Sequence, residues 1–154
     1  MDPESGLDAV RNVGIREGRV AAISSEPLRG MRVIDARGLV VAPGFIDLHS
    51  HGLNNASNEF QAHDGVTTAL ELEAGVPSVG EYLRGRNGNA MLNYGSTVSH
   101  TAARVMAMKG YVAGVGGTEE ALGLKGEGRN LPLTSEEEYS QLAFLLEKGL
   151  KEGG

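Results

Sequence analysis

The fold of this chain is decided by the run Pro43-Gly44-Phe45-Ile46-Asp47-Leu48-His49-Ser50-His51-Gly52. The apolar residues at its centre predict a buried strand, and two histidines stand at the exit of that strand. Because successive side chains of a strand alternate between its faces, His49 and His51 should emerge on the same side, together with Asp47. Two imidazoles placed in this way can bind one ion at about 2.0–2.1 Å per Zn–N bond. The run therefore predicts a metal site at the end of a strand, which favours a hydrolase over other classes of protein.

A second strand, predicted from Val66 to Glu73, offers carboxylates to the same site. Its alternation places Glu71 and Glu73 on one face of a mostly apolar strand. Burying two unpaired carboxylates is costly, and a cation would compensate for that cost. Glu73 lies closest to the C-terminal end of the strand, where the active sites of βα barrels form. We therefore expect Glu73 to be the third or bridging ligand and Glu71 to lie one layer deeper; the alternative is a solvated face of an edge strand.

The pattern of strands and helices changes after Pro43. Short alternating runs with turn residues between them predict strands at 13–16, 19–23, 31–35 and 39–42, the first two joined by a hairpin turn at Glu17-Gly18. From residue 44 onward, strands predicted at 45–49, 66–73 and 90–94 alternate with helical stretches at 54–63, 78–86 and 99–109. This alternation indicates parallel βα units. We therefore expect a small β portion at 1–43 and a βα portion at 44–154.

The clearest helix signal covers Thr134 to Lys151. Its start, Thr134-Ser135-Glu136-Glu137, predicts a capping box, in which a hydroxyl and a carboxylate bind free backbone N–H groups. One apolar stripe is predicted to follow at helical spacing, formed by Tyr139, Leu142, Ala143, Leu146 and Leu150. The glycine-rich stretch between Gly110 and Pro132 is predicted to be an irregular, lid-like excursion.

Composition narrows the class of protein. The 154 residues are 40% hydrophobic and 22% charged, values typical of a globular chain. A net charge of −6 without a basic run argues against nucleic acid or an anionic membrane as partner. No apolar stretch approaches the ~20 residues of a membrane span, and the first residues do not form a signal peptide, so we expect a cytoplasmic protein. Because the chain has no Cys, a metal site must use His, Asp or Glu.

The run from Val33 to His51 resembles the start of the amidohydrolase superfamily, in which a small β-sandwich leads into a metal-bearing (β/α)8 TIM barrel. The runs Asp64 to Gly75 and Asn93 to His100 are similar to the N-acyl-D-amino-acid deacylase (D-aminoacylase) branch. The resemblance implies an α/β fold with a β-sandwich portion at 1–43 and the first βα units of the barrel, about three of them, at 44–154. Because members of this family are much longer than this chain and carry their remaining ligands on later strands, the resemblance also implies an N-terminal fragment.

The resemblance also implies a function: metal-dependent cleavage of a C–N amide bond, with deacylation of an N-acyl-D-amino acid as the first interpretation and one or two Zn²⁺ ions as cofactor. His49 and His51 match the first two metal ligands of the family. Some D-aminoacylases carry a metal-binding Cys near the second strand, whereas this chain has Ala74 beside Glu73. Glu73 is therefore inferred as the third ligand. A bound ion would polarise the amide carbonyl and activate water.

No catalytic residue is assigned within the chain, because the resemblance places the catalytic Asp on a later strand, beyond Gly154. Three other residues are expected close to the chemistry. Asp47 is expected to orient a ligand histidine by accepting a hydrogen bond, and Glu71 and His100 are expected to support a ligand or contact the substrate. For His100, which begins or precedes a helix, the alternative is a structural role at the helix start.

Two further interpretations remain open. The first is a dihydroorotase-like or dipeptidase-like hydrolase that cleaves a cyclic amide or a peptide. The second is a non-catalytic fragment that needs another chain, because an open sheet of three βα units leaves an edge suited to self-association. Alone, the chain is expected to bind Zn²⁺ weakly and to show no turnover.

Overall fold

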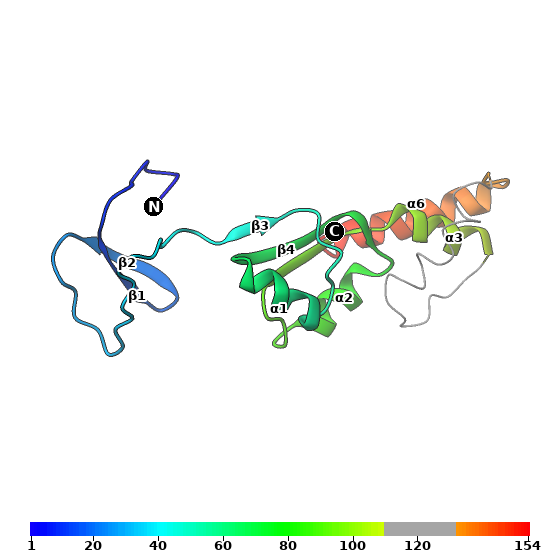
Figure 1. The fold of residues 1–154 in the computed structure, drawn as a ribbon. Coiled ribbons are helices and arrows are strands. Elements are labelled where there is room, and N and C mark those ends of the chain that lie inside the picture. The colour runs from blue at the N-terminus through cyan, green and yellow to red at the C-terminus, as the bar shows by residue number, and fades with distance from the viewer. Residues whose placement is uncertain (110–131) are drawn as a thin grey trace. The chain divides into compact units, whose positions relative to one another are not determined.

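The computed structural model describes residues 1–109 and 132–154, which form two compact units, Met1–Pro43 and Gly44–Gly154 (Figure 1). The lid-like excursion expected between Gly110 and Pro132 lies outside the described residues. Within the described ranges, no helix is both long enough and apolar enough to cross a membrane.

The first unit contains one antiparallel hairpin, formed by β1 (Asn12–Arg16) and β2 (Arg19–Ser24). Its two turn residues, Glu17 and Gly18, both have positive φ angles, 52° and 71°. Two left-handed residues in a row give a tight turn whose twist matches that of the flanking strands. The predicted hairpin is therefore confirmed.

The strands predicted at 31–35 and 39–42 are wrong, because the structure shows no strand in either segment. The sheet of this unit is the β1–β2 pair alone, so neither segment has a neighbouring strand to bond. Val33 and Val40 are 78% and 73% exposed. Apolar alternation produces a stable strand only where a partner strand and a covered face exist. In the described unit, the expected β-sandwich portion is thus a single hairpin.

The second unit is built on a parallel sheet in the order β3-β4-β5 (Figure 1). Its strands are β3 (Phe45–Asp47), β4 (Val66–Val76) and β5 (Asn93–Val98). The helices between and after them are α1 (Asn55–His63), α2 (Val79–Arg86) and α3 (His100–Lys109). The predicted α/β class and the alternation of strands with helices are confirmed. In the described residues the sheet is open and does not close into a barrel.

Pairing with β4 decides where β5 lies. The predicted strand at 90–94 is misplaced, since the structure begins β5 at Asn93 and ends it at Val98. Ser96 pairs with Glu71 and is 5% exposed. Its hydroxyl donates to the Glu71 carbonyl at 3.2 Å, so a small polar residue is satisfied inside the sheet. This partner lies far away along the chain, so the local sequence pattern does not reveal it.

The end of β4 departs from regular pairing. Glu71 lies opposite Ser96, whereas Val76 lies opposite Val98, so residues 72–75 face Thr97 alone. This bulge contains Gly75, whose φ is 68°. Bulges bend a strand and redirect its side chains, and they occur often next to active sites.

The last helix, α6 (Glu136–Lys151), packs against α3 and β5 (Figure 1). Its capping box is formed by Ser135 and Glu138, one residue later than predicted. The Glu138 carboxylate accepts from the backbone N–H of Thr134 at 2.6 Å and from the N–H of Ser135 at 3.2 Å. Because one carboxylate reaches both N–H groups and the Thr134 hydroxyl, the later register satisfies more donors.

The packed side of α6 is rotated from the predicted stripe. Leu142 and Leu146 are half-buried as expected, but the other predicted members, Tyr139, Ala143 and Leu150, are exposed. The buried position is Gly149, where an added Cβ would lie 2.5 Å from the Val98 Cβ. A glycine lets the helix backbone approach β5 directly, and this contact sets the rotation of the helix.

Replacing Glu138 with Gln is expected to remove part of the acid sensitivity of α6. The backbone N–H and the hydroxyl of Thr134, together with the N–H of Ser135, hold the pKa of Glu138 below its ordinary value of 4.5. A lowered folded-state pKa stabilises the helix above pH 4.5 and loses this contribution as the pH falls through the lower folded value. Helicity followed by circular dichroism should therefore fall more steeply below pH 4.5 in the wild type than in Glu138→Gln; identical acid profiles would contradict the role of the box.

Candidate metal centre

The histidine segment leaves β3 and folds back onto β4. β3 ends at Asp47, two residues earlier than predicted, and His49 forms an isolated bridge with Glu71. The backbone N–H of Ser50 donates to the Leu70 carbonyl at 3.0 Å. These backbone contacts place the segment that carries both histidines beside the end of β4.

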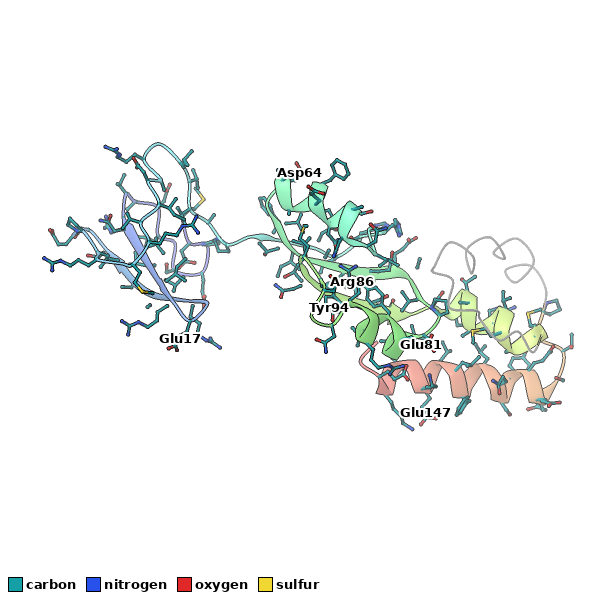
Figure 2. The ribbon with its side chains drawn as sticks, turned by 90° about the horizontal axis from the view of Figure 1, so that it is seen from below. Glu17, Asp64, Glu81, Arg86, Tyr94 and Glu147 are labelled. Carbon is teal, nitrogen blue, oxygen red and sulfur yellow. The ribbon has the colours of Figure 1, made fainter. Side chains whose placement is uncertain are left out.

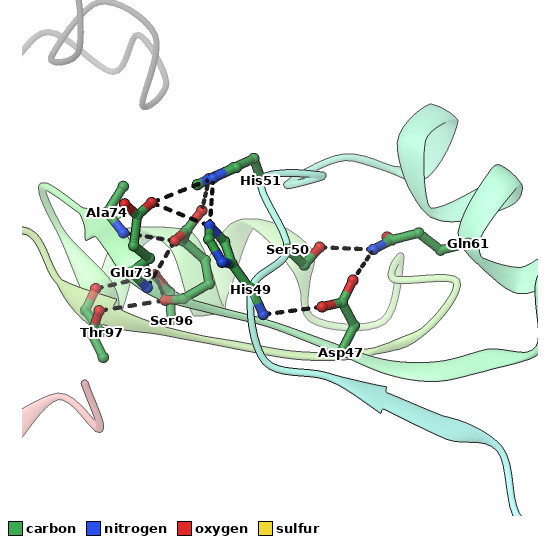
Figure 3. A network of polar contacts seen from close by, with 10 residues as sticks. Asp47, His49, Ser50, His51, Gln61, Glu73, Ala74, Ser96 and Thr97 are labelled. Atoms are coloured by element: carbon green, nitrogen blue, oxygen red, sulfur yellow. Dashed lines mark hydrogen bonds and ion pairs between the residues drawn. The ribbon is translucent and has the colours of Figure 1, made fainter.

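Asp47 holds this segment through the main chain. Its Oδ1 accepts from the backbone N–H of His49 at 3.0 Å, so its partner on that residue is the main chain and not the ring (Figure 3). Its Oδ2 accepts from Nε2 of Gln61 at 3.1 Å, and the same Gln61 nitrogen donates to the Ser50 hydroxyl at 2.9 Å. Helix α1 is thereby tied to both sides of His49.

A polar network that the sequence analysis missed connects α1 to α2. Asn58 is 2% exposed and donates to Gln61 Oε1 at 2.8 Å and to the Gly52 carbonyl at 2.9 Å. Arg86 of α2 donates to Asn58 Oδ1 at 2.5 Å and lies over the ring of Tyr94, at 5.3 Å from the centroid (Figure 2). The only signal in the sequence is the i, i+3 spacing of Asn58 and Gln61 on a predicted helix, which does not identify a partner on α2.

Three donor atoms converge in front of β4. The Nε2 atoms of His49 and His51 lie 3.1 Å apart, and Glu73 Oε2 lies 3.5 Å from the first and 3.4 Å from the second (Figure 3). In a tetrahedral site with bonds of about 2.0–2.1 Å, ligand atoms are separated by about 3.3–3.4 Å. The triangle therefore has the size of one face of a zinc tetrahedron, and the donor set of two imidazoles and one carboxylate fits Zn²⁺.

The triangle is open on one side. The side chains of His49, His51 and Glu73 are 65%, 56% and 61% exposed. Catalytic zinc sites keep a fourth position free for water or substrate, whereas structural sites close it with protein ligands. The alternative for an exposed cluster is a pair of His–Glu ion pairs, which contribute little in solvent. That alternative does not require both Nε2 atoms to face the same carboxylate oxygen.

Glu71 lies beneath this triangle and contacts it directly. Its side chain is 0% exposed, and its Oε2 lies 2.6 Å from Nδ1 of His51. Burial by itself raises the pKa of Glu71, but the N–H of Ala74, the ring of His51 and the N–H of Glu73 outweigh it, so the pKa lies below its ordinary value. The carboxylate is therefore an ionised acceptor at neutral pH.

The structure brings together part of the residue set expected from the sequence. Among the described residues, the donor atoms close enough to share one ion are those of His49, His51 and Glu73. His100 is exposed at the start of α3 and does not belong to this group. Metal binding by the three residues stays a prediction, as does a role for His100 with substrate.

Comparison with known proteins adds the family. A family model described as "Amidohydrolase family" matches residues 32–145. The dihydroorotase of Streptococcus pneumoniae serotype 4 is 52% identical over 52 residues, which cover 33% of this chain and 12% of that protein. The dihydroorotase of Anaeromyxobacter sp. strain K is 51% identical over 53 residues, with the same coverage. The allantoinase of Bacillus licheniformis is 35% identical over 81 residues, or 45% of this chain and 18% of that protein.

No solved structure matches the chain. The matched parts span 12% to 18% of the length of these relatives, so the relatives' own activities do not transfer to the chain directly. The family model, in contrast, extends from before β3 into α6 and includes the whole triangle of donor atoms. On that match, the chain belongs to the amidohydrolase family.

Proposed function

We propose that this chain supplies His49, His51 and Glu73 to the metal centre of a hydrolase that opens the C–N amide bond of a cyclic substrate. The observation that carries the proposal is the triangle of two imidazole nitrogens and one carboxylate oxygen, with edges of 3.1, 3.4 and 3.5 Å. A Zn²⁺ ion bound there supplies a Lewis acid that polarises an amide carbonyl and lowers the pKa of water. Membership of a metal-dependent hydrolase family supports the same chemistry.

The residues of this chain have distinct tasks in the proposed centre. His49 and His51 offer neutral nitrogen ligands, and Glu73 contributes a negative charge that favours a divalent cation. The Asp47 carboxylate keeps His49 in place by accepting from the His49 backbone N–H, and Gln61 connects Asp47 to α1. The exposed side of the triangle leaves room for an amide carbonyl and a water molecule.

The names of the relatives support the proposed class of substrate. Dihydroorotase and allantoinase are names of enzymes that act on cyclic amides, and both match this chain. They favour a cyclic amide over the N-acyl-D-amino acid that the second strand suggested. The resemblance of the run Asp64 to Gly75 to the D-aminoacylase branch keeps deacylation as the second candidate. In either case the partner is a small molecule.

Self-association remains a further proposal. β3 lies at the edge of the sheet, and its residues Phe45 and Ile46 are 68% and 63% exposed. An uncovered apolar edge strand is able to pair with another strand. This proposal is separate from the metal centre.

The substrate class can be tested by assaying the purified chain with Zn²⁺ on dihydroorotate, allantoin and an N-acetyl-D-amino acid side by side. We expect Zn²⁺ to bind, and any turnover to fall on the cyclic amides and to vanish in His49→Ala. Cleavage of the N-acetyl-D-amino acid with the rings intact would establish deacylation instead. Because no catalytic residue is assigned within this chain, bound Zn²⁺ without turnover on any substrate would mean that residues outside this chain complete the site. Absence of bound Zn²⁺ would overturn the proposed centre.

A further inference from the structure

One buried carboxylate contacts two of the three donor residues. The Glu71 side chain is fully buried, and its two oxygens point to different parts of the triangle. A buried charge is tolerated only when each oxygen is well hydrogen-bonded. The identity of its donors therefore shows what the carboxylate does.

The first oxygen, Oε1, holds the backbone of the β4 bulge. It accepts from the N–H of Glu73 at 3.1 Å and from the N–H of Ala74 at 2.8 Å. Both N–H groups belong to residues 72–75, which leave the regular pairing with β5. The carboxylate takes the place of the missing strand partner and so sets the position of the Glu73 backbone.

The second oxygen, Oε2, holds the ring of His51. It lies 2.6 Å from Nδ1 of that ring. The other oxygen of this carboxylate accepts from two backbone N–H groups, as an ionised carboxylate does, and such a group only accepts hydrogen bonds, so the proton between Oε2 and the ring is assigned to Nδ1. The lone pair is then on Nε2, the atom that faces His49 and Glu73. A carboxylate that fixes the tautomer of a ligand histidine in this way also raises its basicity.

We propose that Glu71 is the positioning residue of the metal centre: one carboxylate oxygen selects the Nδ1–H tautomer of His51, and the other fixes the bulge that presents Glu73. The proposal rests on the proposed function, since it concerns the same metal ligands. Glu71 itself does not contact the ion, because its oxygens are occupied by His51 and by the bulge. The His51 ring and the backbone of Glu73 are thus both held by the same buried carboxylate.

The matched variant is Glu71→Gln. The Gln side chain has a single accepting oxygen, and the N–H groups of Glu73 and Ala74 in the bulge require an acceptor, so we expect the oxygen to face them. The amide nitrogen then faces Nδ1 of His51 as a donor, which demands the opposite tautomer, Nε2–H. A purely structural role for Glu71 would change the free energy of unfolding without reversing the tautomer.

The test is nitrogen NMR of the metal-free 154-residue chain, in which the four histidines can be assigned by single replacements. We expect wild-type His51 as Nδ1–H and the Glu71→Gln variant as Nε2–H, with upfield shifts of the Glu73 and Ala74 amide protons. The affinity for Zn²⁺, measured by competition with a chromophoric chelator, should fall about 10–100-fold. The control Glu73→Gln should weaken Zn²⁺ binding and leave the His51 tautomer unchanged.

The outcomes separate the two proposals. Wild-type His51 in the Nε2–H form, or a Glu71→Gln variant with wild-type tautomer and Zn²⁺ affinity, would overturn the role of Glu71 alone. Failure of the wild type to bind Zn²⁺ would overturn the proposed function and this role with it. If Glu71→Gln does not fold, the tautomer of the wild type still decides, because it needs no variant.

Discussion

Replacing His51 with alanine is expected to abolish Zn²⁺ binding by this chain. The replacement removes one corner of the donor triangle and leaves the Glu71 carboxylate buried without its imidazole partner. Loss of a group that merely orients a ligand costs about 10–100-fold in metal affinity, so the loss of a ligand should exceed about 100-fold. His49→Ala should lower the affinity to a similar extent. Competition with a chromophoric chelator, or the visible absorption of bound Co²⁺, measures the effect.

His63→Ala is the matched control for these variants. His63 is exposed at the last position of α1 and is outside the group of donor atoms, so its removal should leave the affinity unchanged. Equal losses of affinity in His51→Ala and His63→Ala would indicate non-specific binding to surface imidazoles. If the cluster were only a set of exposed His–Glu ion pairs, His51→Ala would change no metal affinity.

Replacing Gly75 with alanine is expected to destabilise the second unit and to weaken the metal centre at the same time. Gly75 has a φ of 68°, and a Cβ there would lie 2.7 Å from the Thr97 carbonyl oxygen and 2.8 Å from the Ser99 nitrogen. Both atoms belong to the backbone and cannot rotate away. The left-handed conformation costs a residue with a side chain about 1–2 kcal/mol, and overpacking adds about 1–3 kcal/mol. Because Gly75 closes the bulge that carries Glu73, Zn²⁺ affinity should fall as well.

Gly88→Ala separates the two contributions. Gly88 has a similar φ of 73°, but nothing lies within 4 Å of its added Cβ. Urea unfolding should therefore show a clearly smaller loss of stability for Gly88→Ala than for Gly75→Ala, with Zn²⁺ affinity unchanged. Equal losses in the two variants would mean that the close approach of β4 and β5 at Gly75 does not exist.

Local patterns in the sequence predict those elements whose partners are close along the chain. The Glu17-Gly18 turn identifies the β1–β2 hairpin, and the helices α1, α2 and α3 are predicted within a residue of their observed bounds. The strands predicted at 31–35 and 39–42 fail for the opposite reason. Their alternation is real, but a strand also needs a neighbour, and the described residues of the first unit provide none.

The candidate site divides in the same way. The spacing of His49 and His51 and the alternation of β4 were sufficient to name three residues whose donor atoms lie together. The sequence predicted Glu71 as a deeper carboxylate that supports a ligand, but not its contacts with the His51 ring and with the N–H groups of Glu73 and Ala74. Two of these contacts depend on the bulge that begins after Glu71. Asn58 and Arg86 were missed because a buried amide and a guanidinium on two helices reveal their pairing only once those helices are packed.

By itself, the sequence determined the order of strands and helices and the presence of two imidazoles and a carboxylate at strand ends, because these depend on side-chain period and turn chemistry within a few residues. The tertiary structure alone decided that β4 bulges opposite Thr97, that Glu71 lies under His51, and that Asp47 holds a backbone N–H. The bulge and the contact between Glu71 and His51 depend on segments that are separated along the chain. Asp47 is close to His49 in the sequence, but its carboxylate is also bound by Gln61 of α1, which only the packing of that helix brings there. Such contacts are set by how the sheet and helices pack, and no periodic pattern in the sequence encodes them.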